Sequence, residues 1–129
     1  MKSDVMLFVR DVEASSAWYQ RLLGARSGHG GPEYEMIVDN EGNLLFQFHR
    51  LDGDEHGINL DEDASPRGAG VLVYVTVTDV NEVYDRALAL SASVSGKPAF
   101  IELAGHTEFI VNDPDGYALA ICTRGNHER

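Results

Sequence analysis

The feature that most constrains the fold of this chain is a four-residue turn that occurs twice. Asp113-Pro114-Asp115-Gly116 separates two apolar, β-favouring runs, and Asp39-Asn40-Glu41-Gly42 separates another two. Both turns read Asp-x-acid-Gly, and the proline of the later turn fixes one φ angle. A glycine at the last position accepts the left-handed conformation that a tight turn needs, so each segment predicts a β-hairpin.

The repetition extends beyond the hairpins. Each hairpin is preceded by a strand pattern, an Asp-Val pair and an amphipathic helix pattern: residues 5–10 lead into Asp11-Val12, and residues 71–78 lead into Asp79-Val80. The paired aspartates are offset by 68 residues (79 − 11) and the turn glycines by 74 (116 − 42). A longer helix-to-hairpin connection in the second half absorbs the difference, so the chain predicts one βαβββ unit written twice.

These patterns predict an α+β fold with eight principal strands and helices near residues 12–23 and 80–91. We expect a single domain, 1–129, with module one at about 1–51, a polar connector at 52–68 and module two at about 69–124. Glycines in 25–33 indicate a loop or weak edge strand, and residues 99–103 a short strand. Asp52, Asp54, Gly57 and Asp63 fall at EF-hand positions one, three, six and twelve, but flanking strands and an aspartate at position twelve disfavour calcium.

The helix patterns carry start and stop signals. Asp11 and Asp79 are predicted N-caps, and Gly24 is a predicted C-terminal stop. We expect one apolar stripe on each helix. The first stripe comprises Val12, Ser16, Tyr19 and Leu23, and the second comprises Val80, Val83, Tyr84, Ala87 and Leu88.

Alternation in the strands assigns residues to opposite faces. In the first strand, Val5, Leu7 and Val9 share one face, while Asp4, Met6 and Phe8 share the other. In residues 44–49 we expect Leu44, Phe46 and Phe48 on one face and Leu45, Gln47 and His49 on the other. The polar pair in this second set makes its face the candidate wall of a site.

The composition of the chain limits the classes of molecule that it can bind and the setting in which we expect it. A chain of 129 residues with 43% hydrophobic content can form one compact core. Its net charge of −11 makes nucleic acid a poor partner and slightly favours a cationic ligand, although acidity also maintains solubility. A single cysteine, no leader pattern and no apolar run of membrane-spanning length lead us to expect a soluble, cytoplasmic protein that is not embedded in a membrane.

Three ordered motifs resemble the vicinal oxygen chelate superfamily, which includes glyoxalase I, extradiol dioxygenases, fosfomycin resistance enzymes and bleomycin resistance proteins. They are Val5-x-Leu7-x-Val9-x-Asp11-Val12, then Trp18-Tyr19-x-x-Leu22-Leu23-Gly24, and finally Gly105-x-x-Glu108-Phe109-x-x-x-Asp113-Pro114-Asp115-Gly116-Tyr117. The resemblance spans nearly the whole chain. It implies two tandem βαβββ modules whose curved mixed sheets enclose a cavity, commonly in a homodimer.

In metal-using members of this superfamily, the ligands come from the first and last strands of each module. The resemblance places those positions at Asp4, Gln47, Leu72 and Ala120, with Gln47 uncertain by one residue. Leu72 and Ala120 have no donor atom, and one carboxylate with one amide oxygen is too small a ligand set for a divalent ion. We therefore expect no bound metal and no cofactor, since His49 or His106 could complete a site only with irregular geometry.

Without a metal, the expected site is a cavity lined mostly by apolar groups with a few polar ones, as in small-molecule sites. The candidate ligand-binding residues are Asp4, Met6, Phe8, Gln47, His49, Leu72, Tyr74 and Ala120, and the other predicted walls are Leu45, Thr76, Ala118 and Cys122. Plain packing is an equal alternative for Phe8 and Tyr74, and an inert buried thiol is the favoured reading of Cys122. His49 could act as a general base near Asp4, although a surface or core histidine is the commoner case.

The sequence thus favours a metal-free small-molecule binding protein resembling the bleomycin resistance group, with drug or metabolite sequestration as a role. The alternative is a glyoxalase- or dioxygenase-like enzyme, a lyase or oxidoreductase, with a divergent metal site or with acid–base chemistry alone. We expect a small planar organic ligand, neutral or cationic rather than anionic. Truncating Tyr74 should weaken its binding more than neutralising an acid in residues 52–63.

Overall fold

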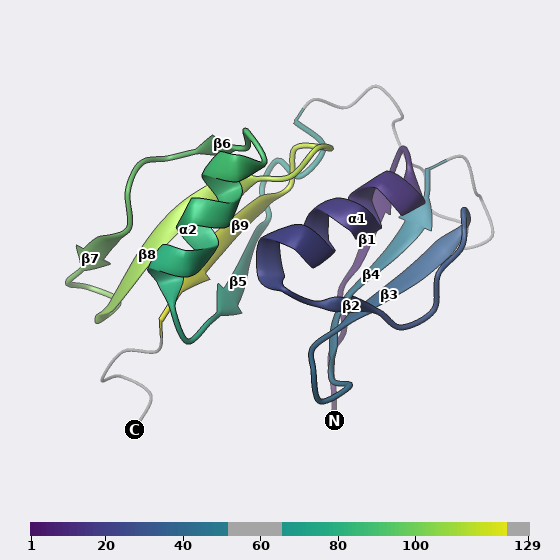
Figure 1. Ribbon diagram of the computed structural model, residues 1–129, viewed down its shortest axis with the longest axis horizontal. Coiled ribbons are helices and arrows are strands. Elements are labelled where there is room, and N and C mark those ends of the chain that lie inside the picture. The colour runs from purple at the N-terminus through teal and green to yellow at the C-terminus, as the bar shows by residue number, and fades with distance from the viewer. Residues whose placement is uncertain (52–65, 124–129) are drawn as a thin grey trace. The chain divides into compact units, whose positions relative to one another are not determined.

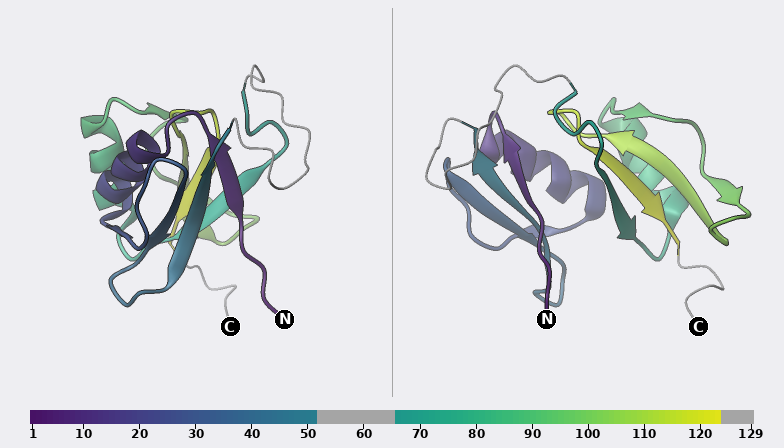
Figure 2. Two further views of the ribbon diagram at one scale, coloured as in Figure 1. Left: turned by 90° about the vertical axis from the view of Figure 1, so that its right-hand side faces the viewer. Right: turned by 180° about the vertical axis from the view of Figure 1, so that it is seen from behind.

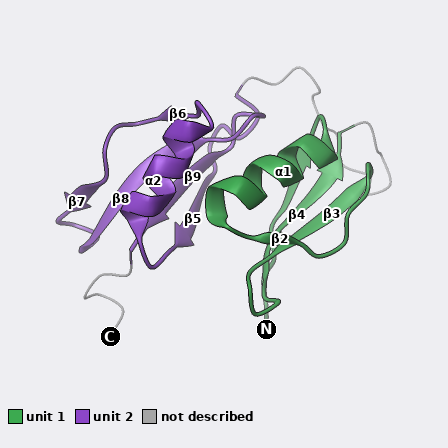
Figure 3. Ribbon diagram, viewed as in Figure 1, with its two compact units in different colours: residues 1–64 green, residues 65–129 purple. Residues whose placement is uncertain are grey.

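The chain folds into two units, residues 1–64 and 65–129, each built from one helix and one mixed sheet (Figures 1 and 3). The computed structural model describes residues 1–51 and 66–123. The α+β class and the repeated order of elements are therefore confirmed. Residues 52–65 of the predicted connector, with the EF-hand-like positions, lie outside the described residues.

The first unit contains four strands and one helix. Its sheet has the order β1-β4-β3-β2, in which β1 and β4 are parallel and the other neighbours are antiparallel. Helix α1 lies on one face of this sheet (Figure 2). The elements are β1 (Met6–Val9), α1 (Val12–Leu23), β2 (Arg26–Ser27), β3 (Tyr34–Val38) and β4 (Leu44–Arg50).

The second unit repeats this plan with one additional strand. Its sheet has the order β5-β9-β8-β6, with β5 and β9 parallel, and β7 also pairs with β8. The short strand predicted near 99–103 is β7, whereas β6 was not predicted and lies just beyond the helix predicted at 80–91. The elements are β5 (Leu72–Thr76), α2 (Val80–Ala89), β6 (Ser93–Val94), β7 (Ala99–Ile101), β8 (His106–Asn112) and β9 (Ala118–Cys122).

Both helices begin at the predicted aspartates. Asp11 Oδ1 accepts a hydrogen bond from the Ala14 N–H at 3.0 Å, and Asp79 Oδ1 accepts from the N–H groups of Asn81 and Glu82, each at 3.1 Å. These bonds satisfy donors that the first helical turn leaves without partners. Gly24 ends α1 with a φ of 66°, which confirms the predicted stop.

The buried helix faces differ in part from the predicted stripes. In α1 the fully buried leucine is Leu22 rather than Leu23, because Leu22 follows the buried Ser15 by seven residues, which is close to two full helical turns. In α2 the buried residues are Val80, Val83 and Ala87, while Leu88 is exposed.

Aromatic packing joins each helix to its sheet. The Tyr19 ring of α1 lies 4.9 Å from the Phe46 ring and 4.8 Å from the Phe48 ring of β4, measured between centroids. In the second unit, Tyr84 of α2 meets the Phe109 ring of β8 edge-on at 5.3 Å. All but Tyr84 are buried, so these contacts form the helix-side core of each unit.

A bulge in β4 changes one predicted face. Ile37 of β3 pairs with Phe46, but the next residue, Val38, pairs with Leu44, so Leu45 is an extra residue in β4. Leu44 therefore shares the face of Val38 and not that of Phe46, which corrects the strict alternation expected for residues 44–49.

The strand pairings show which residues of the two units are equivalent. In the first unit Met6 of β1 pairs with Gln47 of β4, and in the second unit Tyr74 of β5 pairs with Ala120 of β9. Met6 and Tyr74 are offset by 68 (74 − 6), the offset of the helix-capping aspartates. Gln47 and Ala120 therefore hold equivalent positions in the two sheets.

The first strand is shorter than predicted. The ladder of β1 begins at Met6, and both Asp4 and Val5 are exposed. Asp4 therefore precedes the strand and is not held on its face.

Candidate functional site

The face of the first sheet opposite α1 brings together four of the predicted site residues. Residues directly opposite on neighbouring strands share a face. One row across the sheet is Met6, Gln47 and Met36, and the next row is Phe8, His49 and Tyr34. Tyr34 and Met36 were not predicted, although the alternating pattern of residues 34–38 could have identified them.

The second row is a cluster of rings. The Phe8 and His49 rings lie 5.3 Å apart between centroids, tilted by 43°. The Tyr34 hydroxyl donates a hydrogen bond to Gln47 Oε1, and its ring meets that of His29 edge-on at 5.0 Å. This face therefore combines apolar and aromatic surface with an amide and a phenol whose orientations are fixed by each other.

The orientation of His49 is set by the backbone. Its Nδ1 lies 2.9 Å from the carbonyl oxygen of Arg50, which can only accept, so Nδ1 carries the proton. In the neutral ring Nε2 is then the basic nitrogen. Asp4, predicted as its partner in acid–base chemistry, is exposed ahead of β1.

The face of the second sheet opposite α2 carries the remaining predicted residues. Leu72 and Tyr74 of β5 are about half exposed, whereas Ala120 and Cys122 of β9 are buried. Cys122 is a free thiol whose sulfur lies 3.8 Å from the hydroxyl of Thr76. Ala120, one of the candidate ligand-binding residues, is completely buried.

A histidine–glutamate pair occupies the same face. Nε2 of His106 lies 2.6 Å from Oε1 of Glu108, and both side chains are largely buried. The Tyr74 ring meets the His106 ring edge-on at 5.8 Å. In the sequence, Glu108 stood out only as part of a motif. It lies two residues after His106 in an alternating strand, however, and this spacing places the two side chains on one face.

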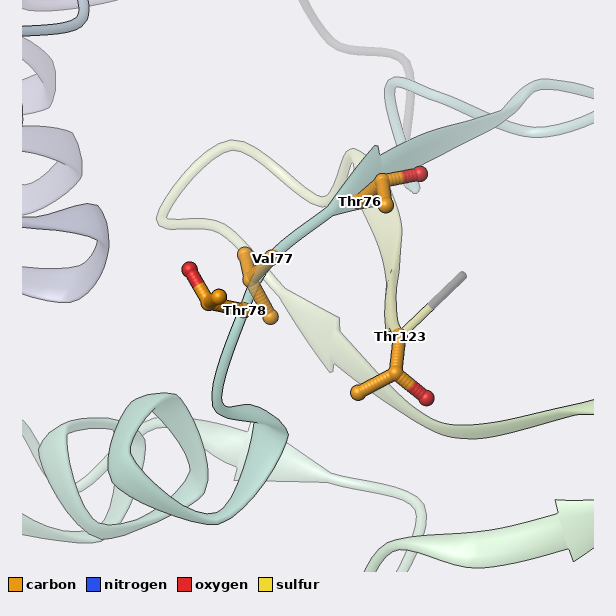
Figure 4. Close-up of a pocket in the computed structure, with 4 residues that line it drawn as sticks. All are labelled: Thr76, Val77, Thr78 and Thr123. Atoms are coloured by element: carbon orange, nitrogen blue, oxygen red, sulfur yellow. The ribbon is translucent and has the colours of Figure 1, made fainter. Parts of the chain in front are cut away.

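A hollow of about 400 Å³ lies at the carboxyl ends of β5 and β9 (Figure 4). Its lining residues are Thr76, Val77, Thr78 and Thr123, of which only Thr76 was a predicted wall. Figure 4 shows the three hydroxyls pointing in different directions, so they do not converge on one ligand atom.

Glu35 of β3 is a buried carboxylate on the helix side of the first sheet that sequence reasoning missed. It accepts hydrogen bonds from the hydroxyls of Ser16 and Ser27 and from the N–H groups of His29, Gly30 and Met36, at distances of 2.7 to 3.2 Å. Burial would raise the pKa of Glu35, but the bonds from Ser16, Ser27, Gly30 and His29 outweigh it and lower that pKa below its ordinary value. Glu35 therefore ties α1 and residues 27–30 to β3.

The metal positions implied by the superfamily do not fit a metal here. Leu72 and Ala120 are hydrocarbon side chains, and the Gln47 oxygen already accepts from Tyr34. Over residues 1–51 and 66–123, no group of three or more His, Cys, Asp or Glu side chains is arranged to hold a metal ion.

Comparison with known proteins agrees with the repeated architecture. The Glyoxalase/Bleomycin resistance protein/Dioxygenase superfamily model matches residues 3–121. The chain belongs to this superfamily, which confirms the resemblance drawn from its motifs. A comparison with curated protein sequences found no significant match.

Solved structures show the same fold at low sequence identity. A glyoxalase-related enzyme from Fulvimarina pelagi has a TM-score of 0.76 and 18% identity, covering 96% of this chain and 88% of that one. A bleomycin resistance determinant encoded on the transposon Tn5 has a TM-score of 0.68 and 17% identity, covering 96% and 98%. A bleomycin-binding protein solved in complex with bleomycin has a TM-score of 0.67, with the same identity and coverage.

Neither helix in the described part of the chain has the length and apolar character that crossing a membrane requires.

Proposed function

We propose that this protein binds a small organic molecule and that binding needs no metal ion. The observation that carries the proposal is the ring cluster of the first sheet, in which Phe8, His49 and Tyr34 form one row beside Gln47. Such a face offers flat apolar area for stacking and a small number of oriented polar groups for specificity.

The chemistry of this face favours a planar ligand. Met6 and Met36 flank Gln47, and flexible thioether side chains adapt to irregular apolar surfaces. The −11 charge of the chain lowers the local concentration of anions and raises that of cations, which favours a neutral or cationic ligand. The structural similarity to a protein that binds bleomycin supports sequestration of a drug or metabolite as the role.

The half-exposed Leu72 and Tyr74 of the second sheet are proposed as further ligand contacts. Their face is the counterpart of the ring cluster, because Tyr74 and Ala120 are equivalent to Met6 and Gln47. We keep a single domain, 1–129, as part of the proposal. A reducing, cytoplasmic location suits the buried free thiol of Cys122.

One observation favours a second candidate function, an enzyme that uses acid–base chemistry without a metal. Burying an imidazole and a carboxylate is costly, and His106 and Glu108 are both largely buried at 2.6 Å from each other. Such pairs are common at proton-transfer sites, and Tyr74 lies against the imidazole. Catalytic turnover that is lost in Glu108→Gln would support this candidate.

The test is a thermal-shift screen of the full chain, purified without chelators or added metal, against aromatic, cationic, thioester and phosphonate compounds. We expect stabilisation by planar neutral or cationic compounds, confirmed by calorimetry and unchanged by excess chelator. Stabilisation only by anionic compounds that are turned over, or about one equivalent of bound transition metal required for binding, would overturn the proposal.

A further inference from the structure

One amide group lies at the centre of the sheet face opposite α1. Gln47 of β4 stands between Met6 and Met36 in its row, and all three side chains are half-buried. Its Oε1 accepts a hydrogen bond from the hydroxyl of Tyr34, which belongs to the neighbouring row. Gln47 is therefore a polar group with an apolar neighbour on each side and a hydrogen-bonded partner beside it.

The bond from Tyr34 fixes which end of the amide donates. A side-chain amide can turn over and exchange its oxygen and nitrogen unless a partner distinguishes the two. Here the phenol hydrogen is directed at Oε1, so the oxygen end stays beside Tyr34 and the nitrogen end points away from it. Within residues 1–51 and 66–123, Nε2 of Gln47 makes no hydrogen bond, so its N–H groups are available to a ligand.

The oxygen end of the same group accepts. A carbonyl oxygen has two lone pairs, of which Tyr34 uses one, and the phenol oxygen can also accept after giving its hydrogen to Gln47. The face therefore presents a donor next to an acceptor in a fixed order. Asn and Gln amides recognise the adjacent acceptor and donor of a nucleobase edge with the same pair of atoms.

The apolar surroundings make this edge selective. The thioethers of Met6 and Met36 are weak acceptors, so they cannot replace a hydrogen bond that a ligand fails to make. A polar group that is left unpaired in a contact costs more free energy than a formed hydrogen bond gains. A carboxylate offers acceptors only and an amidinium offers donors only, so each brings like groups together at one end of the amide.

We propose that Gln47, held by Tyr34, selects a planar neutral heterocycle whose edge carries a hydrogen-bond acceptor and a donor on adjacent atoms. Cyclic amides, with C=O beside N–H, and amino-substituted azines, with a ring nitrogen beside NH₂, share this edge. The selection rests on the proposed function, since it needs a small molecule bound at the ring cluster. It narrows the expected ligand from neutral or cationic to neutral.

The first test is calorimetric titration of the full chain with matched probes. Carbostyril is a planar cyclic amide, and N-methylcarbostyril has the same rings and carbonyl without the N–H. We expect carbostyril to bind at least about tenfold more tightly, because the N-methyl form leaves the acceptor unpaired. Aminopyrazine and its N,N-dimethyl form are the corresponding pair for the amino-azine edge, and a preference for the N–H form in either pair supports the proposal.

The second test changes the polarity of the edge. Gln47→Glu replaces the donor end by an acceptor, keeps the shape of the side chain and can still accept from Tyr34. Wild type should bind benzamide more tightly than benzamidine, and the ratio of benzamidine to benzamide affinity should rise at least about tenfold in Gln47→Glu. Asn81→Asp is the charge control, because it adds the same charge at the exposed start of α2 and should leave that ratio unchanged.

The outcomes separate this selection from the proposed function. Equal affinity within both pairs of probes, tighter binding of benzamidine than benzamide by wild type, or equal affinity ratios in folded Gln47→Glu and Asn81→Asp would overturn the role of Gln47. The binding function would stand in those cases, because planar compounds still bind. Failure of every planar compound to bind would overturn both.

Discussion

Asp39 and Asp113 make the same hydrogen bonds in the two hairpin turns. Oδ1 of Asp39 accepts from the N–H groups two and four residues later at 2.9 and 2.8 Å, and Oδ1 of Asp113 does so at 2.9 and 2.8 Å. In both turns the aspartate carbonyl oxygen also accepts from the glycine N–H. The repeat in the sequence is therefore a repeat of one turn geometry, held by a side chain that mimics the backbone.

Asp113→Ala should destabilise the protein more than Asp39→Ala. Asp113 is buried, so its loss leaves the N–H groups of Asp115 and Tyr117 without a partner and out of reach of water, at a cost of about 1–3 kcal/mol. The bonds of Asp39 are exposed, so water can replace the carboxylate. Urea unfolding of both variants measures the difference, and equal losses would show that burial of the turn does not matter.

The turn glycines give a second matched pair. Gly42 and Gly116 have φ angles of 86° and 94°, so alanine at either position carries the cost of a left-handed residue, about 1–2 kcal/mol. A Cβ at Gly42 would meet nothing within 4 Å, but one at Gly116 would lie 3.2 Å from the backbone nitrogen of Arg67. Gly116→Ala should therefore lower the unfolding temperature further than Gly42→Ala, and the reverse order would contradict this crowding.

Local signals in the sequence were sufficient for most of the fold. The helix caps at Asp11 and Asp79 and both hairpin turns could be predicted because each depends on residues within four positions of one another. The bulge at Leu45 and the strand β6 could not, because each depends on the register with which it pairs with another strand. The bulge also explains why strict alternation placed Leu44 on the wrong face.

The candidate site was predicted in part for the same reason. Alternation within β1 and β4 placed Met6, Phe8, Gln47 and His49 on one face, and the sheet register then brought them together. Glu35 is surrounded by groups from α1 and residues 27–30, so only the tertiary structure reveals why a carboxylate is buried there. Asp4 was misplaced because the sequence does not show where a ladder stops.

Glu35 should make the stability of the protein depend on pH in the acid range. The pKa of Glu35 in the folded protein is lowered from its ordinary value of 4.5, so its ionised form stabilises the fold. That contribution is fully present above the ordinary pKa and is lost as the pH falls through the folded pKa. Glu35→Gln should cost about 1–3 kcal/mol near pH 7, because an amide cannot accept all of the hydrogen bonds that the carboxylate receives.

The difference in unfolding free energy between wild type and Glu35→Gln should stay constant from pH 7 to about 5 and shrink in more acidic solution. Glu41→Gln is the control, since Glu41 is exposed in the neighbouring turn and should show neither effect. A difference that grows as the pH falls would mean that the folded pKa is raised instead of lowered.

The ring cluster should govern ligand affinity through its flat area more than through its polar contacts. Phe8→Ala removes a face of the cluster, and Tyr74→Ala removes the half-exposed ring of the second sheet; each should weaken binding about 10- to 100-fold, as expected for an aromatic side chain that stacks on a ligand. Tyr34→Phe keeps the ring but frees the Gln47 amide, so a smaller loss of about 3- to 10-fold is expected.

Phe100→Ala removes an equally large exposed ring outside the proposed site and should leave affinity unchanged. Calorimetric titration of the four variants with a compound that stabilises the wild-type protein gives the order directly. Equal effects of Phe100→Ala and Phe8→Ala would show that the ligand does not bind at the face opposite α1.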